Sequence, residues 1–208
     1  MSKGTGKVRR LGIMGGTFDP VHYGRLVGAE GARHDLKLEK VIFIPAGRPP
    51  NKPHSRITEP WLRYRMTGLA VASNPFFEVS SIEVERTGPS YTINTVQAIS
   101  RLYPGAQIYF ITGSDALVDI HAWKGIEHLL TICRFVAAAR PGYRVDELWE
   151  RLDSLIGDLR RNIICMEVPA LAISSTDIRQ RVREGRPIKY LLPEPVEDFI
   201  KKNQLYRQ

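Results

Sequence analysis

Two adjacent glycines stand near the start of the chain, in the stretch GIMGGTFDPVHYGR from Gly12 to Arg25. Gly15 and Gly16 follow an apolar run, carry no side chain that would keep a ligand from the backbone, and permit positive φ at a turn. The stretch has neither the G-x-G-x-x-G order of a dinucleotide-binding fold nor the G-K-[ST] of a P-loop. A glycine turn after a strand still suits a phosphate group, because the phosphate can approach the backbone N–H groups closely.

The next residues can complete such a site. Asp19-Pro20 is expected to start a helix, whose free N–H groups and positive dipole end attract anions. On that helix His22 and Arg25 would share one face of the first turn, and Gly24 between them would keep the wall low. We therefore predict a polyphosphate site. The alternative is a tight turn with a surface histidine and arginine.

A second stretch, ISSTDIRQRVREG, has the same character. Ser174, Ser175 and Thr176 are expected at a helix N-terminus, with Asp177 completing a capping box and Arg179 one turn further on. Alone, this motif would be an ordinary cap with an exposed arginine. Two helix N-termini with hydroxyls or glycines and nearby cations favour a grip on a triphosphate from two sides.

Alternating apolar and helical segments must position these two stretches. Strands alternating with helices predict a doubly wound α/β domain with a parallel, Rossmann-like sheet, in which ligands bind beyond the carboxyl ends of the strands. The expected strands are Val8 to Met14, Lys40 to Pro45, Phe77 to Val84, Gln107 to Thr112, Arg134 to Ala139 and Asn162 to Val168. The expected helices are Gly24 to Leu36, Pro60 to Ala72, Thr92 to Leu102, Ala116 to Leu130, Asp146 to Leu159, Ser175 to Glu184 and Glu194 to Asn203.

The bulk composition fits a single enzyme-sized domain. With 208 residues, 43% of them hydrophobic, the chain can bury a core as one domain over residues 1–208, of which residues 1–7 would be a flexible basic tail. No apolar run approaches the ~18 residues of a membrane span, and the start has no signal-peptide core, so we expect a cytoplasmic protein without a membrane partner. Cys133 and Cys165 lie in apolar stretches and are expected to be buried thiols, with no metal site.

The charge balance indicates an anionic partner without identifying it. The formal net charge is +8 and the pI is about 9.7, which suits a nucleotide, a nucleic acid or simple counterions. No RNA-binding aromatic signature or zinc-finger spacing accompanies the charge, so we do not expect a nucleic-acid partner. One segment, Ala46 to Glu59, holds three prolines and few apolar groups and is predicted to be a mobile loop.

The two phosphate motifs carry a family resemblance. GGTFDPVHYG together with ISSTDIR resembles the nucleotidyltransferase superfamily with HxGH and ISSTxxR motifs, and specifically its bacterial nicotinate mononucleotide adenylyltransferases. The likeness extends over nearly the full length, through GRPPNKPHS, GPSYTINTV, YFITGSDAL, HAWKGIEHLL, RFVAAARPGY and YLLPEPVEDFIKKNQLY. One residue departs from the pattern: Arg25 stands where the family has the second histidine of HxGH. Arginine keeps the positive charge but is bulkier than histidine and always cationic.

The resemblance implies transfer of the adenylyl group of ATP to nicotinate mononucleotide, giving nicotinate adenine dinucleotide and pyrophosphate. Magnesium would arrive on the ATP phosphates, held by phosphate oxygens and water, so Asp19 is not expected to be a metal ligand. The family also often self-associates, which makes a homo-oligomer an expectation. The implied catalytic residues are His22, Arg25 and Arg179, and the implied ATP-binding residues are Gly15, Gly16, Thr17, Phe18, Lys52, Ser174, Ser175 and Thr176.

The acceptor side is implied by other segments. Trp123 would stack on the pyridinium ring, Asp115 would take the ribose hydroxyls, and Tyr91 and Thr92 would line the nicotinate pocket beside Gly113. Without the resemblance, Trp123 is equally well a core residue, and Tyr91-Thr92 only a helix cap.

Several alternatives stay open from the sequence. Arg63 and Arg140 are basic residues without a clear implied role, and each would otherwise form a surface ion pair. The acceptor could be nicotinamide mononucleotide or another phosphate, such as phosphopantetheine, although that acceptor has no aromatic ring to contact Trp123. Because of Arg25, the chain could also be a catalytically impaired protein that binds nucleotide or RNA.

Overall fold

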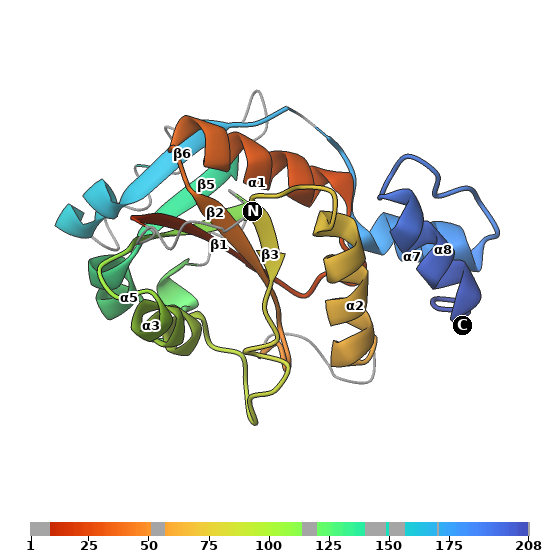
Figure 1. The fold of residues 1–208 in the computed structure, drawn as a ribbon, viewed down its shortest axis with the longest axis horizontal. Helices are drawn as coiled ribbons and strands as arrows, with labels where there is room; N and C mark the ends of the chain where they lie inside the picture. The colour runs from red at the N-terminus through yellow and green to blue at the C-terminus, as the bar shows by residue number, and fades with distance from the viewer. Residues whose placement is uncertain are drawn as a thin grey trace, which may run out of the picture.

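The structure is a computed structural model that describes residues 9–50, 57–113, 120–139, 149, 157–169 and 171–207. The strands of this part of the chain form a parallel sheet of six in the order β3-β2-β1-β4-β5-β6 (Figure 1). This order confirms the predicted doubly wound, Rossmann-like architecture, and it reverses direction between β1 and β4. The strands are β1 (Arg10–Gly16), β2 (Lys40–Pro45), β3 (Phe77–Val79), β4 (Gln107–Gly113), β5 (Arg134–Ala139) and β6 (Ile163–Glu167).

Helices cover both faces of the sheet. In Figure 1, α1 crosses one face and α3 and α5 lie against the other, while α2 lies between the sheet and the pair α7 and α8. The helices are α1 (Tyr23–Asp35), α2 (Pro60–Val71), α3 (Thr92–Leu102), α5 (Ile126–Ile132), α7 (Ser175–Arg183) and α8 (Glu194–Lys202), with short 3-10 turns η2 (Ile120–Ala122) and η3 (Gly157–Asn162).

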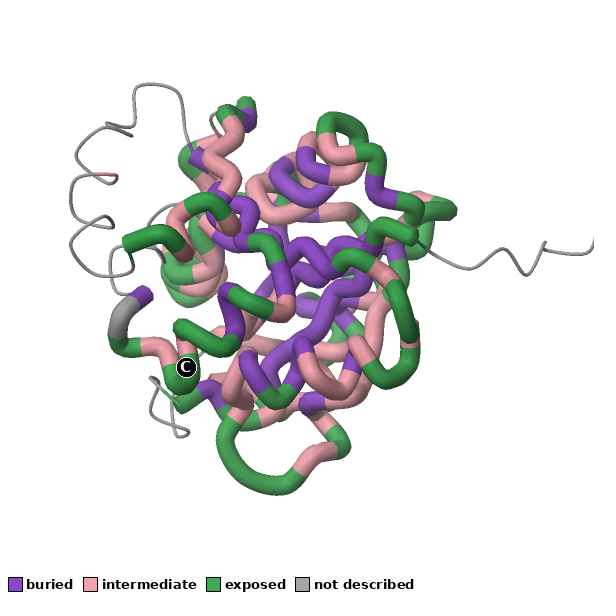
Figure 2. The backbone as a smooth tube through the Cα atoms, turned by 90° about the vertical axis from the view of Figure 1, so that its left-hand side faces the viewer, coloured by how far each residue is buried: buried purple, intermediate pink, exposed green. Residues whose placement is uncertain are grey.

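The strands are buried on both faces because each face carries a helical layer. Along β1, Leu11 and Ile13 pack into the core beneath α3 and α5, whereas Met14 packs into the core beneath α1 and α2. This alternation is the period of two that a strand imposes on its side chains. Figure 2 shows the buried residues concentrated in the central strands, with mixed burial along the helices around them. The central strands β1, β2, β4 and β5 are therefore mostly buried, whereas the edge strands β3 and β6 are partly exposed.

Two predicted elements differ from the structure. The strand expected from Phe77 to Val84 ends at Val79, and irregular backbone follows, in which Glu83 is buried by contacts outside the sheet. The helix expected from Ala116 to Leu130 is not continuous over its described part, because Gly125 adopts a left-handed φ of 67° before α5 begins. The helix expected from Asp146 to Leu159 lies mostly outside the described residues, and its end belongs to η3.

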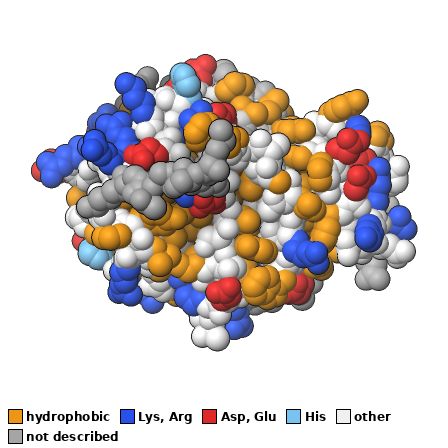
Figure 3. All heavy atoms as spheres, viewed as in Figure 1, with side chains coloured by type: hydrophobic (Ala, Val, Ile, Leu, Met, Phe, Trp, Pro, Cys, Tyr) orange, Lys and Arg blue, Asp and Glu red, His pale blue; other side chains and the backbone are white. Residues whose placement is uncertain are grey.

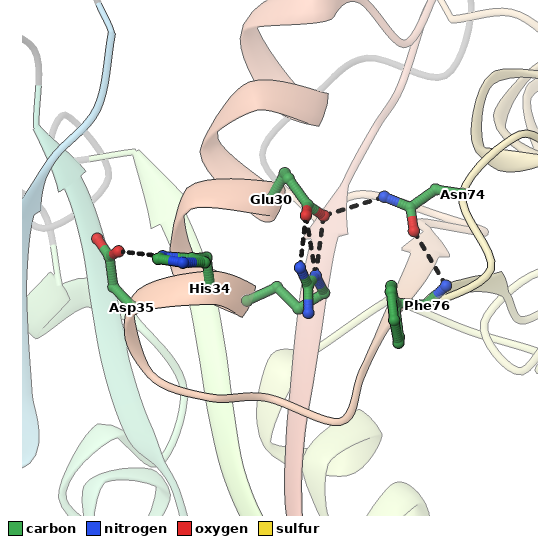
Figure 4. Close-up of polar contacts among 6 residues, drawn as sticks. Glu30, His34, Asp35, Asn74 and Phe76 are labelled. Carbon is green, nitrogen blue, oxygen red and sulfur yellow. Dashed lines mark hydrogen bonds and ion pairs between the residues drawn. The ribbon is translucent and has the colours of Figure 1, made fainter.

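A polar cluster fixes α1 against the turn that precedes β3. Glu30 receives two hydrogen bonds from Arg33 Nε and one from Arg33 Nη2 at 2.7 to 3.0 Å, and a further one from Asn74 Nδ2 at 3.0 Å (Figure 4). Asn74 Oδ1 in turn accepts from the backbone N–H of Phe76 at 3.0 Å, and the guanidinium of Arg33 lies 4.3 Å from the Phe76 ring centroid. Because these contacts hold the C-terminal half of α1, its N-terminal end has a fixed position over the sheet.

The surface charge is distributed rather than gathered in one patch. On the face shown in Figure 3, Lys and Arg side chains lie at both ends of the molecule, and acidic groups lie among them over α7 and α8. Within that region Arg181 pairs with Asp177 at 2.7 Å and Arg186 with Glu184 at 3.0 Å. Part of the basic excess is therefore paired at the surface.

The structure also bears on two expectations drawn from the composition: buried cysteine thiols and no membrane-spanning segment. Cys133 is buried, which raises the pKa of its thiol to about 12, and Cys165 is half-buried; both are free thiols. Among the described residues, no helix is both long and apolar enough to cross a bilayer.

Candidate active site

The turn after β1 differs from its prediction in where the helix begins. Helix α1 starts at Tyr23, and His22 is its extended N-cap with φ −149° and ψ 167°. The expectation that Asp19-Pro20 starts the helix, and that His22 lies on it, is therefore wrong. The physical reason is tertiary: α7 takes the carbonyls of Asp19 and Pro20 as acceptors, so they do not accept helical hydrogen bonds. The Asp19-Pro20 peptide is cis.

The two glycines of the motif provide space rather than unusual φ angles. Both belong to β1, and the residue with positive φ is Phe18 at 50°, which corrects the expectation of a glycine-based turn. A Cβ atom on Gly15 would lie 3.0 Å from the Phe110 ring, and one on Gly16 would lie 3.1 Å from the Phe18 ring. A side chain at either position would therefore displace an aromatic ring by a few tenths of an ångström, which favours glycine at the end of the strand.

Gly24 has a similar role toward His22. The histidine is only 6% exposed, and a Cβ atom on Gly24 would lie 3.1 Å from its Nδ1 and 3.7 Å from the carbonyl oxygen of Ile173. Arg25 follows in the first turn of α1, half-buried, with its backbone N–H donating to the His22 carbonyl at 3.0 Å. Gly24 thus lies directly beside the His22 ring, and of His22 and Arg25 only Arg25 belongs to the helix.

The second motif docks directly onto this turn. Ser175 Oγ donates to the Pro20 carbonyl at 2.9 Å, and Arg179 Nη1 donates to the Asp19 carbonyl at 2.7 Å. Arg179 Nη2 also lies 3.3 Å from Thr176 Oγ1. The structure thus brings together the two stretches that the sequence singled out separately. The N-terminus of α7 and the turn before α1 form two sides of one cationic, N–H-rich cradle.

The N-terminus of α7 has one of the two hydrogen bonds of the predicted capping box. Ser174 is the N-cap, and its Oγ accepts from the backbone N–H of Asp177 at 3.1 Å. The Asp177 carboxylate instead accepts from Arg181 Nε at 2.7 Å, one turn further along the helix. The capping serine therefore fixes the first turn of α7, while Asp177 stabilises the helix surface.

Asp19 is a structural anchor of the turn. Its carboxyl group is 4% exposed; Oδ2 accepts from the backbone N–H of Thr58 at 3.2 Å and Oδ1 from the Tyr206 hydroxyl at 2.7 Å. Burial and the neighbouring Asp19 charge raise the pKa of the Tyr206 phenol well above its ordinary value. Sequence reasoning missed this pair, because a contact between positions so far apart leaves no local signal.

Arg63 also proved different from its prediction. The guanidinium is 1% exposed and donates to three backbone carbonyls: to Thr58 from Nε at 2.8 Å, to Thr17 from Nη1 at 2.7 Å and to Gly47 from Nη2 at 3.2 Å. Burial lowers the pKa of this guanidinium and the Asp19 charge opposes that effect, but arginine stays cationic. The surface ion-pair alternative is therefore wrong. A signal existed: Arg63 shares the buried stripe of α2 with Met66, Thr67 and Ala70.

The predicted acceptor residues lie along the other face of the sheet. Gly113 ends β4, Tyr91 is the N-cap of α3, and Thr92 is the first residue of that helix. Trp123 packs edge-on against Phe110 and Phe135, at 5.9 and 5.6 Å between ring centroids. Tyr91 and Trp123 pack against the same hydrophobic core cluster. Trp123 is therefore partly a core residue, as the alternative from the sequence held. Its side chain is only half-buried, so part of the ring is accessible to a ligand.

Not every predicted residue can be placed. Lys52, Asp115 and Arg140, and the tail over residues 1–7, lie outside the described residues, as does most of the proline-rich segment. In the described part, no group of three or more His, Cys, Asp or Glu side chains could hold a metal ion.

The sheet order places both halves of the site at one edge. β1 and β4 are neighbours, with Met14 paired to Ile111, so their carboxyl ends at Gly16 and Gly113 open on the same side. This is the position where strand order reverses and where doubly wound folds bind ligands. The docked turn and α7 N-terminus thus lie on one side of this position, and the aromatic residues Tyr91 and Trp123 lie on the other, an arrangement suited to joining a nucleotide to a second phosphate compound.

This fold and this paired cradle define a nucleotidyltransferase, and residues 13–181 match the family described as cytidylyltransferase-like. Curated relatives named "Probable nicotinate-nucleotide adenylyltransferase" include one from Moorella thermoacetica, 55% identical over 199 residues that cover 95% of this chain and 92% of the relative. Another, from Mycobacterium tuberculosis, is 44% identical and covers 94% and 91%. The chain belongs to the nicotinate-nucleotide adenylyltransferase family.

Solved structures agree on the fold. The nicotinic acid mononucleotide adenylyltransferase of Plasmodium falciparum, complexed with NaAD, superposes with a TM-score of 0.77 at 19% identity, covering 95% of this chain and 97% of that one. The same protein complexed with APC gives a TM-score of 0.75.

Proposed function

We propose that the protein transfers the adenylyl group of ATP to nicotinate mononucleotide, releasing pyrophosphate and forming nicotinate adenine dinucleotide, a step of NAD biosynthesis. The observation that carries this proposal is the docking of Ser175 and Arg179 onto the Asp19-Pro20 turn, which builds one two-sided phosphate cradle at the switch point of the sheet. The family of the chain supports the choice of nicotinate mononucleotide as acceptor.

The chemistry needs positioning and charge rather than a base. The acceptor phosphate is largely dianionic at pH 7, since its second pKa is about 6. One of its oxygens attacks the α-phosphorus in line, the bond from that phosphorus to the bridging oxygen breaks, and the electron pair leaves with pyrophosphate. No proton has to be removed. The protein must therefore align two anions that repel each other and stabilise the charge that moves onto the leaving group.

The cradle residues fit the ATP side of this reaction. Gly15, Gly16, Thr17 and Phe18 would contact the nucleotide through their backbone, and His22 and Arg25 would lie beside the α-phosphate. Ser174 would fix the first turn of α7, so that Ser175, Thr176 and Arg179 hold the β- and γ-phosphates. Arg179 is already tied to the Asp19 carbonyl, so its guanidinium is preorganised beside the turn. Lys52 is proposed as a further cation.

The acceptor would lie across the β4 end of the crevice. Trp123 would stack on the pyridinium ring, and Tyr91 and Thr92 would line the nicotinate pocket, with backbone N–H groups at the start of α3 facing its carboxylate. Gly113 leaves space at the strand end, and Asp115 is proposed to bind ribose hydroxyls.

Magnesium fits this site only as an ion bound to the ATP phosphates and not to protein side chains. The Asp19 carboxyl group lies at the turn, but its two oxygens accept from Thr58 and Tyr206 and are buried. The ion would be held by phosphate oxygens and water, and it would supply charge neutralisation on the phosphates.

The proposal is tested by pyrophosphate release with ATP and each acceptor side by side: nicotinate mononucleotide, nicotinamide mononucleotide and phosphopantetheine. We expect the fastest turnover with nicotinate mononucleotide. His22→Ala should lower kcat by at least about a hundredfold, the scale of losing a preorganised donor, with an unchanged circular dichroism spectrum. Near-normal turnover in this variant would remove His22 from its proposed role.

The second candidate, an impaired nucleotide-binding protein, is favoured by Arg25 and by the basic charge balance of the chain. Restoring the family residue with Arg25→His should keep or raise the rate, because a histidine at this position also donates to phosphate. A large loss would show that the site is built around arginine. Nucleotide binding by calorimetry without turnover of any of the three acceptors would support the impaired protein instead.

A further inference from the structure

Arg63 joins three separate segments with one buried planar group. Its acceptors are the carbonyls of Thr17 in the turn after β1, Gly47 in the segment after β2, and Thr58 just before α2. Each of the three guanidinium nitrogens donates to a different segment. Arg63 is only 1% exposed, so its guanidinium depends on these three carbonyls for its hydrogen bonds and in turn ties the three segments together.

The bond to Thr17 orients the peptide that enters the phosphate turn. In a trans peptide the carbonyl and the following N–H point in opposite directions. Since the Thr17 carbonyl faces the guanidinium, the Phe18 N–H faces away from it. The other end of this peptide is held by the Phe18 ring, which is 4% exposed and packs 5.9 Å from the Phe43 ring centroid. Phe18 keeps its positive φ of 50° between these two restraints.

The segment after β2 also contacts the backbone that leads to Tyr91 and Thr92, the proposed acceptor-binding residues at the start of α3. A Cβ atom on Gly47 would lie 2.0 Å from the Glu83 carbonyl oxygen, so the two backbones are in direct contact. Arg48 and Ser90 exchange two hydrogen bonds, at 3.1 Å from the Arg48 N–H to Ser90 Oγ and 2.9 Å from the Ser90 N–H to the Arg48 carbonyl. Tyr91 follows immediately. The backbone that leads into α3 is thus joined to the segment after β2 by bonds that do not involve the Arg63 side chain.

We propose that Arg63 is a positioning residue for the nucleotide: its guanidinium sets the Thr17-Phe18 peptide that faces ATP and holds the segment after β2 against it. This inference rests on the proposed adenylyl transfer for its substrate. It predicts that a change at Arg63 weakens the nucleotide side of the site more than the mononucleotide side.

The test compares Arg63→Met with Arg65→Met, a change of an exposed arginine on the same helix. For Arg63→Met we expect ATP affinity, measured by calorimetry without acceptor, to fall by about tenfold or more, the scale of losing one or two buried hydrogen bonds. The KM for ATP should rise in parallel and kcat should fall, while the KM for nicotinate mononucleotide stays within about twofold. Arg65→Met should match the wild type in all of these.

The lysine variant separates positioning from folding. Arg63→Lys keeps the charge but cannot reach three carbonyls in a plane, so its ATP affinity should lie between those of the wild type and Arg63→Met. The proposal is overturned if a folded Arg63→Met binds ATP like the wild type, or if both KM values rise equally. If Arg63→Met does not fold, an unchanged ATP affinity in Arg63→Lys overturns it, and a weakened affinity with an unchanged mononucleotide KM supports it. Loss of the proposed function would be distinguishable, because the wild type would then bind ATP but turn over no pyridine mononucleotide.

Discussion

A methyl group at position 24 would crowd the histidine of the phosphate turn. The hydrogen of Gly24 faces the His22 ring, and the Cβ atom of an alanine would lie 3.1 Å from Nδ1 and 3.2 Å from Cε1. The ring would have to move by a few tenths of an ångström. At the same time alanine is a better helix residue than glycine by about 0.5 to 1 kcal/mol. Stability and activity should therefore respond in opposite directions.

We predict that Gly24→Ala keeps or slightly raises Tm but lowers kcat by about tenfold, because small displacements of a catalytic group reduce rate steeply. Thermal unfolding and steady-state pyrophosphate release measure the two effects. Gly28→Ala is the matched control, since a Cβ atom there meets only Ala138 Cβ at an ordinary 3.7 Å. Gly28→Ala should raise Tm without changing kcat. Equal activity in the two variants would contradict the steric argument.

The segments on either side of α8 support the turn from outside. Tyr206 places its hydroxyl 2.7 Å from Asp19 Oδ1, and the Tyr23 N–H, at the start of α1, donates to the Leu191 carbonyl at 3.1 Å. Helices α2 and α8 are also in contact, which keeps these two segments close to the turn. The C-terminal part of the chain thus does more than carry Ser175 and Arg179: Leu191 and Tyr206 also bond to the stretch on which these residues dock.

We predict that Tyr206→Phe lowers the free energy of unfolding by about 2 kcal/mol, the usual scale for a hydrogen bond to a charged carboxylate. The loss should be visible in chemical denaturation, with a modest drop in kcat/KM for ATP. Tyr190→Phe serves as the control, because Tyr190 is 81% exposed. If the two variants unfold at the same denaturant concentration, the bond to Asp19 contributes nothing.

How well the sequence predicts an element depends on where its stabilising partners lie. Strand β2 and helix α3 agree with their predicted bounds residue for residue, because apolar runs and helical periodicity are local. The strand predicted to reach Val84 ends five residues earlier, at Val79, since the burial of Glu83 comes from contacts with Thr95 and Arg86 rather than from the sheet. Periodicity cannot distinguish these two causes of burial.

The distance to the stabilising partners also explains which parts of the candidate site could be predicted. The two phosphate motifs were predictable, because glycines and hydroxyls at strand ends and helix N-termini have a local physical meaning. The position of His22 as an extended N-cap outside α1, the Asp19–Tyr206 pair and the three bonds of Arg63 were not predicted, because each depends on a distant segment. The roles of the individual site residues remain predictions that the variants above test.

The stability of the whole molecule should depend on one buried carboxyl group. Glu83 is 7% exposed; its Oε1 accepts from Thr95 Oγ1 at 2.5 Å and lies 3.8 Å from Arg86 Nη2. Burial raises the pKa of this carboxyl, and the hydrogen bond from Thr95 only partly opposes the effect. The folded state therefore holds the Glu83 proton to a higher pH than the unfolded chain does.

From this sign, the contribution of Glu83 to stability is greatest below its ordinary pKa of 4.5 and falls as pH rises through the folded value. Glu83→Gln carries no charge, so its Tm should exceed that of the wild type at pH 8 and approach it as pH falls toward 4.5. Parallel thermal melts from pH 4.5 to 8 measure the difference. A lower Tm for Glu83→Gln at pH 8 would mean that Arg86 and Arg63 stabilise the carboxylate more than burial penalises it.

The bond between Tyr206 and Asp19 joins two residues that the ribosome makes at widely separated times. The ribosome makes the turn early, but Ser175, Arg179 and Tyr206 follow only after some 150 to 190 further residues. At about 5 to 20 residues per second, the delay is on the order of ten seconds or longer. During translation the turn therefore waits for its partners, and its contacts with Ser175, Arg179 and Tyr206 can form only once those residues have left the ribosome.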